Sequence, residues 1–494
     1  MMKTSNRKYQ WPLLAIAMLS QVGICVAQSP AGGKEGLGHN KYPVSTEVQL
    51  LYILSDLKTD TSYSRLFEHA NFFFDQKEYD HAIGFYDRLL LKRPSDPVVL
   101  NNRGACHALL GNHEASLRDY AYALRLSPES SALYNNRGMS KSKMGKTEAA
   151  IEDFRRAIQL DANSGMAYNN LSVAYYQLNN FSAAKKCLLL AMDCERKSPM
   201  IHNNMGLVLS AQGKLRLALL EFEKAIRIGD DYQPAYANRG RVYKELGMYE
   251  SAIDDFSKAL TLGGNKDGYL FTLRGQLYET IEKWEMALAD YRHVLKLVPG
   301  DESALLGLGN VLQRNGDHQG AITNFEEVIR ISPNNPQAYV NLGMLSANTG
   351  DYSQALSCLD RADSLGYQEH DLYAIRGKVF LAMGNLEAAT DDISKAIEID
   401  PQSVPAHESL GILHLHSKDF QGALREFDLS IKFADKSESE TLASVFFNRA
   451  TVHANLGMYV AAMDDLTKAN NFCGDRQLKD AIQELRLRLL GKGG

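Results

Sequence analysis

The sequence predicts an all-α solenoid built from paired antiparallel helices. Three observations lead to this fold class. A small residue recurs from residue 63 onward, mostly in steps of 34 residues; a second small residue follows it twelve positions later; and Gly and Pro recur at fixed places between apolar runs. A period of this length is typical of arrays in which each structural unit stacks on its neighbours. Although 494 residues would ordinarily suggest about three domains, we expect one quasi-linear array.

We number the positions of each repeat as slots 1 to 34, with Tyr63 at slot 1 of repeat 1. The steps between repeats are 34 residues, except for 35 before Gly275 and 39 before Ala450. The twelve small residues at slot 8 are Ala70, Gly104, Gly138, Ser172, Gly206, Gly240, Gly275, Gly309, Gly343, Gly377, Gly411 and Ala450. Slot 20 is Ala in all but one repeat, and slot 24 is large and apolar. Small slots let paired helices approach, and the large slot fills the remaining space.

Each repeat is expected to form two helices. Large apolar residues at slots 4, 7 and 11 recur at helical spacing, as at Tyr168, Leu171 and Tyr175. Glycine at slot 15 of eight repeats, for example Gly111, should end the first helix in a left-handed conformation. Proline at slot 32 of five repeats, for example Pro94, should end the second helix.

These residues resemble the tetratricopeptide repeat family. Tyr236–Gly240 (YANRG) and Ala252–Phe256 (AIDDF) are close to its consensus, and the pattern extends over residues 63–476. The resemblance implies a right-handed superhelical solenoid of helix hairpins whose first helices line a concave, protein-binding face. We divide the array into repeats 1–6 (63–266) and repeats 7–12 (267–476). Residues 477–494 should form a C-terminal capping helix and tail, with Leu478, Ile482, Leu485 and Leu489 in one apolar stripe.

The N-terminus has the pattern of a secretory signal peptide over residues 1–27. Lys3, Arg7 and Lys8 precede an apolar stretch that ends at Ala27. We therefore predict an exported protein, in the periplasm or envelope of a bacterium, or extracellular. Membrane association would require an uncleaved N-terminus or a lipid on Cys25. Residues 28–62 should form a flexible lead-in and a capping helix near 46–58.

One junction departs from the pattern. Residues 262–268 (LGGNKDG) lack the slot-32 proline and carry a one-residue insertion. Harmless loop variation explains this; a flexible joint near Gly264 is the alternative.

The sequence offers no arrangement typical of an enzyme, a metal site or a cofactor site. His407, His414 and His453 occupy core slots, and Gly411 stands where a zinc-protease helix would need its second histidine. Acidic pairs at slots 22–23, such as Asp254–Asp255, Asp391–Asp392 and Asp464–Asp465, are interpreted as a solvated helix face. Near-balanced charge, with 54 basic and 59 acidic residues, gives no reason to expect nucleic acid.

One feature goes beyond the demands of the fold. Slots 5 and 6 hold asparagine pairs in four consecutive repeats, although Asn costs up to about 0.7 kcal/mol in a helix relative to Ala. This row continues into repeat 6 and consists of Asn101, Asn102, Asn135, Asn136, Asn169, Asn170, Asn203, Asn204 and Asn238. It resembles the asparagine ladder of O-linked N-acetylglucosamine transferases, which implies paired hydrogen bonds to an extended peptide.

Other residues at concave slots complete the predicted binding face: Met139, Met166, Val173, Tyr176, Met200, Leu207, Arg241 and Lys244. We expect a non-enzymatic scaffold that binds an extended peptide or partner protein in repeats 2–6, in assembly or secretion of envelope proteins. The alternatives are a recruiting subunit of a separate enzyme complex and the substrate-recognition superhelix of a glycosyltransferase system. The sequence does not define an oligomeric state.

Overall fold

The structure, a computed structural model, describes residues 62–435, 439–474 and 476–490. These residues form 25 α-helices and no strand. The all-α solenoid is therefore confirmed. The predicted signal peptide, lead-in, N-terminal capping helix and C-terminal tail beyond residue 490 lie outside the described residues.

The chain divides into two compact halves between Asn265 and Lys266. The N-terminal half holds repeats 1–6: α3 (Tyr63–Asp75), α4 (Tyr79–Lys92), α5 (Pro97–Leu109), α6 (His113–Leu126), α7 (Ser131–Lys143), α8 (Thr147–Leu160), α9 (Gly165–Gln177), α10 (Phe181–Cys194), α11 (Pro199–Ala211), α12 (Leu215–Ile228), α13 (Gln233–Glu245) and α14 (Tyr249–Leu262). At the division, Gly264 and Asn265 both have left-handed backbone conformations, with φ of 67° and 56°. The flexible joint near Gly264 stays a prediction.

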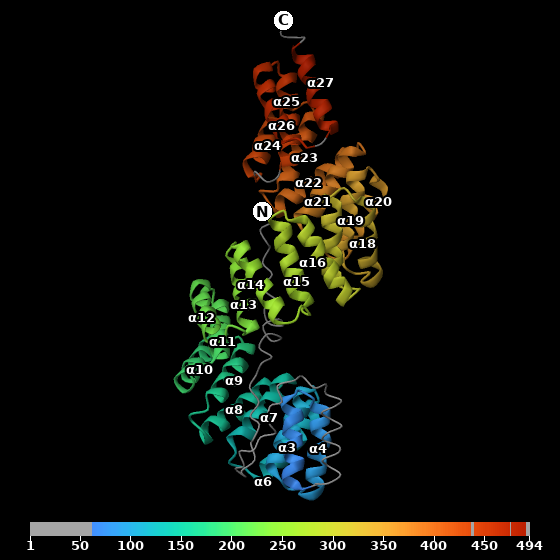
Figure 1. Cartoon of the computed structure of the whole chain (residues 1–494). Helices are drawn as coiled ribbons and strands as arrows, with labels where there is room; N and C mark the ends of the chain where they lie inside the picture. The colour runs from blue at the N-terminus through green and yellow to red at the C-terminus, as the bar shows by residue number, and fades with distance from the viewer. Residues whose placement is uncertain (1–61, 436–438, 475, 491–494) are drawn as a thin grey trace. The chain divides into compact units, whose positions relative to one another are not determined.

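The C-terminal half holds repeats 7–12 and a final helix. Its helices are α15 (Gly268–Thr280), α16 (Trp284–Leu297), α17 (Glu302–Arg314), α18 (His318–Ile331), α19 (Pro336–Thr349), α20 (Tyr352–Ser364), α21 (His370–Ala382), α22 (Leu386–Ile399), α23 (Val404–His416), α24 (Phe420–Phe433), α25 (Ser439–Asn455), α26 (Tyr459–Phe472) and α27 (Arg476–Leu490). Figure 1 shows the succession of hairpins along the chain.

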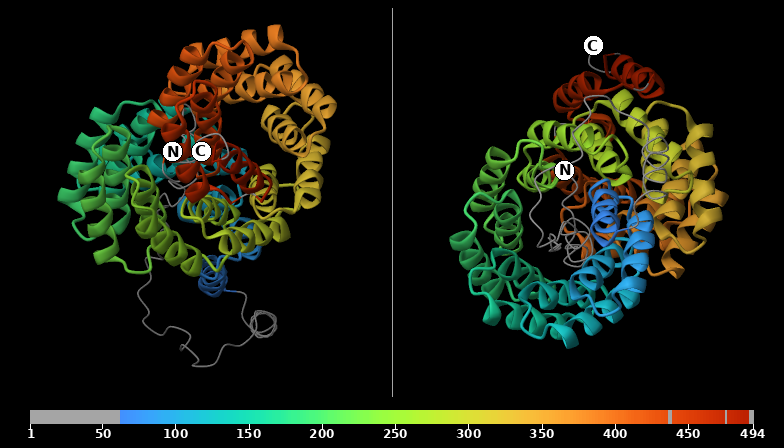
Figure 2. Two further views of the ribbon diagram at one scale, coloured as in Figure 1. Left: turned by 90° about the horizontal axis from the view of Figure 1, so that it is seen from above. Right: turned by 60° about the horizontal axis from the view of Figure 1, so that its bottom comes forward.

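Each first helix packs on its own second helix, and within each half, from repeat 2 onward, also on the first helix of the next repeat. In the N-terminal half these first-helix contacts join α5 to α7, α7 to α9, α9 to α11 and α11 to α13. The hairpins follow one another along a curved path, as Figure 2 shows. The first helices thus form a continuous layer that can hold residues of several repeats next to each other.

In nine repeats, a glycine at slot 8 leaves room for the large side chain of slot 24. A Cβ atom on Gly206 would lie 2.6 Å from a ring carbon of Phe222, and one on Gly309 would lie 2.5 Å from Phe325. Both distances are too short for carbon atoms that are not bonded. The predicted close approach of the paired helices is confirmed.

The turn after each first helix has one conformation throughout the array. All eight glycines predicted at slot 15 have positive φ: Gly111, Gly145, Gly213, Gly247, Gly316, Gly350, Gly384 and Gly457. The other four repeats force a residue with a side chain into the same region: Lys77, Asn179, Glu282 and Lys418. The position of the turn is therefore fixed by packing of the repeat, and glycine only makes the conformation less costly.

The predicted end of the second helix is also confirmed. The second helix ends at Lys92 before Pro94 and at Leu126 before Pro128. At the C-terminus, α27 covers the array with Ile482 and Leu489, which are buried. No helix among the described residues has the length and apolar character needed to cross a membrane.

Two expectations about slots 7 and 23 were wrong. Slot 7 is not uniformly apolar, and the second acid of each acidic pair is not solvated: Asp255, Asp392 and Asp465 are 2–7% exposed. Six repeats instead pair an arginine at slot 7 with an aspartate at slot 23: Arg103–Asp119, Arg137–Asp153, Arg239–Asp255, Arg274–Asp290, Arg376–Asp392 and Arg449–Asp465.

Each of these bridges is bidentate and joins the two helices of one repeat. Arg239 donates from Nε and from Nη2 to Asp255, at 2.8 and 2.7 Å. A carboxylate can be buried at this position because the arginine satisfies both of its oxygens. Where slot 7 is leucine, the bridge is replaced in different ways: Leu171 packs in one cluster with Cys187, and Leu342 in one cluster with Cys358. In repeat 11, Leu410 occurs with Glu426, which is paired with His407. Arginine at slot 7 and aspartate at slot 23 therefore occur together in six repeats, and neither occurs at its slot in the other six.

Candidate functional site

The nine asparagines at slots 5 and 6 form one continuous hydrogen-bonded ladder through repeats 2–6. All are buried, with 0–5% of their surface exposed. Between repeats, the slot-6 amide nitrogen donates to the slot-5 oxygen of the preceding repeat at 2.8–2.9 Å. Within a repeat, the slot-5 nitrogen donates to the slot-6 oxygen at 3.1–3.4 Å.

The ladder has a direction and two different ends. Every hydrogen bond between repeats runs the same way, from a slot-6 amide nitrogen to the preceding repeat. At the N-terminal end Asn102 hydrogen-bonds the hydroxyl of Tyr86, which in turn donates to Asn71 Oδ1 at 2.8 Å. At the other end, repeat 6 has Ala237 at slot 5, and Asn238 Oδ1 has no hydrogen-bond partner among the described residues. The ladder therefore ends on an acceptor in repeat 6.

These partners differ from those expected for a peptide-binding row. The amides bond to each other across the repeats, so the low helix propensity of asparagine is offset by hydrogen bonds inside the protein. In this arrangement their oxygens and nitrogens are not presented to a peptide backbone. The ladder instead fixes the first helices of repeats 2–6 relative to one another.

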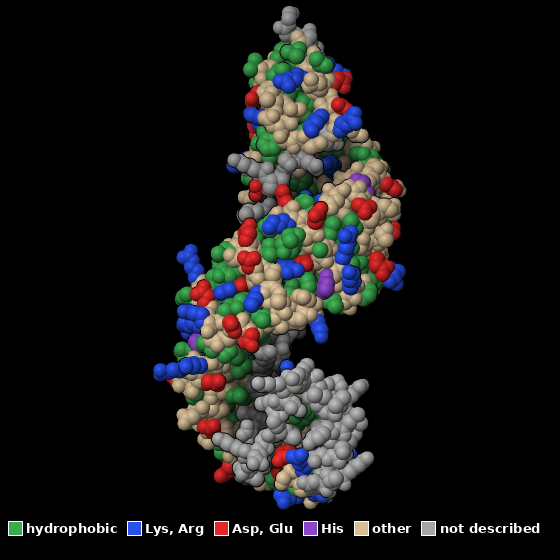
Figure 3. Space-filling view, viewed as in Figure 1, with side chains coloured by type: hydrophobic (Ala, Val, Ile, Leu, Met, Phe, Trp, Pro, Cys, Tyr) green, Lys and Arg blue, Asp and Glu red, His purple; other side chains and the backbone are tan. Residues whose placement is uncertain are grey.

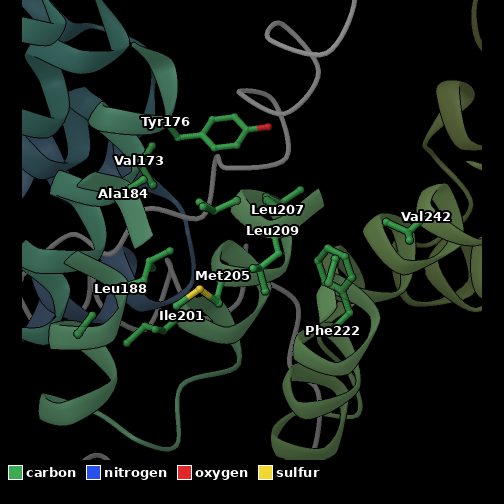
Figure 4. Packing of buried hydrophobic residues seen from close by; sticks show 13 residues of the cluster. Val173, Tyr176, Ala184, Leu188, Ile201, Met205, Leu207, Leu209, Phe222 and Val242 are labelled. Carbon is green, nitrogen blue, oxygen red and sulfur yellow. The ribbon is translucent and has the colours of Figure 1, made fainter. Parts of the chain in front are cut away.

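The predicted apolar residues lie on the same helices at different depths. Met139, Val173, Tyr176 and Leu207 are buried, with 4–8% of their surface exposed, while Met166 and Met200 are half-buried at the starts of α9 and α11. Val173, Tyr176 and Leu207 belong to one apolar cluster. Figure 4 shows Val173 and Tyr176 on α9 beside Leu207 on α11.

A polar cluster adjoins these apolar residues in repeat 6. Arg241 and Lys244 lie one turn apart on α13, and both are half-buried. Burial lowers the pKa of Lys244, and the positive charge of Arg241 lowers it further. Burial raises the pKa of Tyr176, whereas Arg241 acts in the opposite direction. Arg241 is thus close enough to influence Lys244 on its own helix and Tyr176 two repeats earlier.

Two further groups belong to this cluster, and sequence reasoning did not select them. Ser210 occupies slot 12 of repeat 5, between Tyr176 and Lys244 in the same slot of the neighbouring repeats. It is 8% exposed, and its Oγ has no hydrogen-bond partner among the described residues. Glu245 follows Lys244; burial raises its pKa, and Arg241 opposes that shift. The slot-12 row Tyr176–Ser210–Lys244 was the signal that could have found Ser210.

The corresponding slots of the C-terminal half contain no such ladder among the described residues. Asn341 donates to Asn310 at 2.9 Å and accepts from Gln337 at 2.9 Å, which makes a short isolated chain. Asn448, at slot 6 of repeat 12, is half-buried. Slot 5 of repeat 11 holds the buried carboxylate of Glu408, which accepts a hydrogen bond from Ser444.

The three histidines predicted to occupy core slots are held by hydrogen bonds or ion pairs to neighbouring residues. His407 is buried between Glu426 and the carbonyl of Pro401, as expected for a core histidine. His414 and His453 are only partly buried and are paired with Asp419 and Asp465. No group of three or more His, Cys, Asp or Glu residues suited to a metal occurs in the part of the chain that the structure describes.

The cysteines at slots 10 and 23 behave as small core residues. Cys106, Cys187 and Cys358 are buried. Burial raises the pKa of the Cys187 thiol to about 11. A thiol that stays protonated at neutral pH is a poor nucleophile.

An array of stacked helix hairpins with a continuous inner layer defines the class of helical-repeat interaction scaffolds. Comparison with family models agrees: models described as tetratricopeptide repeat match residues 67–131, 131–164, 165–197, 234–265, 272–336, 312–379 and 370–403. The chain belongs to the tetratricopeptide repeat family. A model described as anaphase-promoting complex subunit 5 matches residues 411–482.

Two curated relatives align with parts of the chain. The human peptidyl-prolyl cis-trans isomerase FKBP4 is 30% identical over 118 residues, which cover 21% of this chain and 26% of the isomerase. The BBSome complex member BBS4 of Bos taurus is 24% identical over 197 residues, or 40% of this chain and 38% of that protein. The alignments thus span about a quarter to two fifths of these relatives.

Two solved structures are similar over larger parts. A chain of the APC/C hetero-tetramer Cut9–Hcn1 is 15% identical and covers 90% of this chain and 93% of its own length, with a TM-score of 0.47. A tetratricopeptide repeat protein from Parabacteroides merdae is 23% identical and covers 51% and 98%, with a TM-score of 0.43.

Proposed function

We propose that the protein is an exported scaffold that holds an extended segment of a partner protein along the first helices of repeats 2–6. The observation that carries this proposal is the asparagine ladder. Because four hydrogen bonds between repeats fix five first helices to one another, the side chains at slots 2, 9 and 12 form a preorganised row. A rigid row lowers the entropy cost of binding a flexible segment.

The chemistry of the row suits such a segment. Met166 and Met200 at slot 2 are half-buried and adaptable in shape. Arg241 and Lys244 add positive charge at one end of the row. On the face shown in Figure 3, by contrast, basic and acidic side chains are interspersed. A sequence-specific partner is therefore better matched to the first-helix row than to that mixed surface.

Site-specific photocrosslinking in intact cells tests this proposal. A photoreactive amino acid at position 166 or 200 should capture one partner, and the crosslinks should map to one contiguous segment of it. The matched control positions are Leu189 and Leu220, which are about half exposed on the second helices α10 and α12. Capture from 189 and 220 but not from 166 and 200 would place the partner on the opposite face and overturn the proposal.

The proposed setting is the assembly or secretion of envelope proteins. It is supported only by the apolar stretch that ends at Ala27, preceded by Lys3, Arg7 and Lys8. Cell fractionation with N-terminal sequencing of the purified protein tests it: a mature chain that begins near Gln28 in the envelope or periplasmic fraction is expected. An unprocessed chain recovered only with cytoplasmic markers would contradict it.

A further inference from the structure

We propose that the outer face of α12 binds the surface of a bilayer that contains anionic lipids. The face lies on the second helix of repeat 5 and consists of Arg216, Leu217, Leu220, Lys224 and Arg227, which we call the basic–apolar face. It is separate from the first-helix row proposed for a partner protein. It is also a different route to a membrane from an uncleaved N-terminus or a lipid in the signal segment.

The exposed residues of α12 have an unusual composition. They are only basic or apolar: Arg216, Leu217, Leu220, Lys224, Arg227 and Ile228. Each of the other eleven second helices exposes at least one aspartate or glutamate, such as Glu148 on α8 and Asp254 on α14. Exposed acids follow α12 only in the next turn, at Asp230 and Asp231. The surface of α12 is therefore not a requirement of the repeat.

Three residues of the basic–apolar face follow one line along the helix. Arg216 and Leu220 are four residues apart, and Leu220 and Arg227 are seven apart, which places all three on one side of α12. Leu217 and Lys224 lie beside this line, and both leucines are 50% exposed. The second helix of the preceding repeat, α10, packs on α11 as α12 does and exposes two further leucines, Leu189 and Leu190.

The positive charge of the face is not neutralised within its own helix. Arg216 and Arg227 are exposed and take part in no ion pair among the described residues. The two acids of α12, Glu221 and Glu223, are partly buried. Glu221 accepts a hydrogen bond from Lys224 at 2.7 Å, so Lys224 alone is partly neutralised. Two arginines thus remain to attract an anionic surface.

An anionic bilayer matches both residue types of the face. Long basic side chains reach the phosphate groups while leucines beside them enter the boundary between headgroups and acyl chains. Charge attraction and apolar burial then act together, and the charge part weakens with salt. A protein partner matches less well, because the centre of a protein interface is usually poor in lysine and rich in aromatic residues. The basic–apolar face has Lys224 and no aromatic side chain.

Vesicle flotation of the full chain tests the proposal. The wild type should bind vesicles of equimolar phosphatidylcholine and phosphatidylglycerol more tightly than vesicles of phosphatidylcholine alone. The variant Arg216→Gln/Arg227→Gln should bind the mixed vesicles about 20-fold more weakly, at about fivefold for each basic residue near an anionic surface. The variant Leu217→Ser/Leu220→Ser should weaken binding to both kinds of vesicle, because it removes apolar surface that the bilayer would bury.

A local probe distinguishes α12 from the N-terminus as the membrane contact. The fluorescence of Leu220→Trp should be quenched by mixed vesicles whose acyl chains are brominated, beyond the quenching of the wild type. Met286→Trp is the matched control, because Met286 on α16 is also 50% exposed but lies next to an exposed acid, Glu285. Its additional tryptophan should not be quenched.

The control for charge is Arg118→Gln/Arg125→Gln, which removes two exposed arginines from α6, a helix that also exposes Glu114. It should bind as the wild type does, and hydrogen exchange of α11 and α12 verifies that each variant is folded. Equal binding by Arg216→Gln/Arg227→Gln and the wild type, or no added quenching in Leu220→Trp, overturns the proposal and leaves the proposed partner scaffold standing. Self-association in sedimentation equilibrium that Leu217→Ser/Leu220→Ser abolishes, without vesicle binding, would assign the face to a second copy of the chain and also overturn the proposal.

Discussion

The two halves of the array differ in the residues at slots 5 and 6 and in the hydrogen bonds that these residues make. In the N-terminal half, slots 5 and 6 hold nine buried asparagines joined into one directional ladder. In the C-terminal half, the same slots are mostly apolar; the exceptions include a short amide chain at Asn341 and a buried carboxylate at Glu408. The Arg–Asp bridges, by contrast, occur three times in each half.

This difference separates two kinds of polar interaction in a solenoid. The Arg–Asp bridge joins the two helices of one repeat, so its contribution belongs to the intrinsic stability of that repeat. The ladder joins first helices of successive repeats, so it adds to the interface term between neighbours. We therefore expect repeats 2–6 to open as a more cooperative block than repeats 7–12.

The largest expected effect comes from breaking one bridge in each half. Arg239→Leu leaves Asp255, which is 5% exposed, without its partner. Burial already raises the pKa of Asp255 against the pull of Arg239, so the unpaired carboxylate should destabilise the repeat by about 3–5 kcal/mol. Arg376→Leu should cost about as much in the C-terminal half. Hydrogen exchange of α13–α14 and of α21–α22 measures each loss locally.

A second substitution, copied from another repeat of the protein, should compensate for Arg239→Leu. Repeat 4 carries Leu171 with Cys187 in place of the bridge. The double variant Arg239→Leu/Asp255→Cys copies that pair and should recover most of the lost stability, because no buried charge remains. A double variant as unstable as Arg239→Leu alone would show that slots 7 and 23 are not a pair.

Breaking the ladder should distinguish the halves. Asn170→Ala removes the donor to Asn135 Oδ1, at 2.8 Å, and the acceptor of Asn169 Nδ2. Two buried groups then lack a partner, at about 1–3 kcal/mol each, while alanine returns up to about 0.7 kcal/mol of helix propensity. We expect a net loss of about 2–4 kcal/mol, seen as faster hydrogen exchange in α7, α9 and α11.

The control for the ladder is Asn448→Ala. This residue has the same slot in repeat 12 but is half-buried, so its replacement should change stability by less than about 0.7 kcal/mol. Equal losses for Asn170→Ala and Asn448→Ala would mean that the ladder adds nothing beyond an ordinary slot-6 residue. The contrast between the two halves would then be unfounded.

The fold was predictable from sequence because its determinants are local and repeated. Glycine at slot 15 and proline at slot 32 report backbone conformation directly. The slot-8 glycine with a large slot-24 residue reports helix approach, as for Gly206 and Phe222. Each of these residue types recurs at the same slot in many repeats, so the prediction of two helices for one repeat is supported by the same pattern in the others.

The side-chain network was less predictable, because pairing depends on positions far apart in the sequence. Asp255 looked like half of a solvated acidic pair until the fold placed it opposite Arg239, sixteen residues away. Asn170 meets Asn135 across 35 residues. The asparagine row was visible as a pattern, but its partners depend on the superposition of repeats. Ser210 could be selected only by its place in the slot-12 row, and its lack of a hydrogen-bond partner among the described residues is visible only in the structure.

The smallest effect concerns acid stability in the N-terminal half. Burial raises the pKa of Glu221, but hydrogen bonds from His202 and Lys224, each at 2.7 Å, outweigh it and leave the pKa below its ordinary value of 4.5. A carboxylate with a lowered folded pKa contributes stability above its unfolded pKa, and that contribution is lost as the pH falls through the folded pKa.

Urea unfolding from pH 7 to pH 3 should therefore show Glu221→Gln less stable than the wild type near neutrality. The gap should close below about pH 4.5, and Lys224→Met should narrow it at every pH where Glu221 is charged. A gap that stays constant down to pH 3 would show that Glu221 has no shifted pKa and that its pair with His202 is energetically silent.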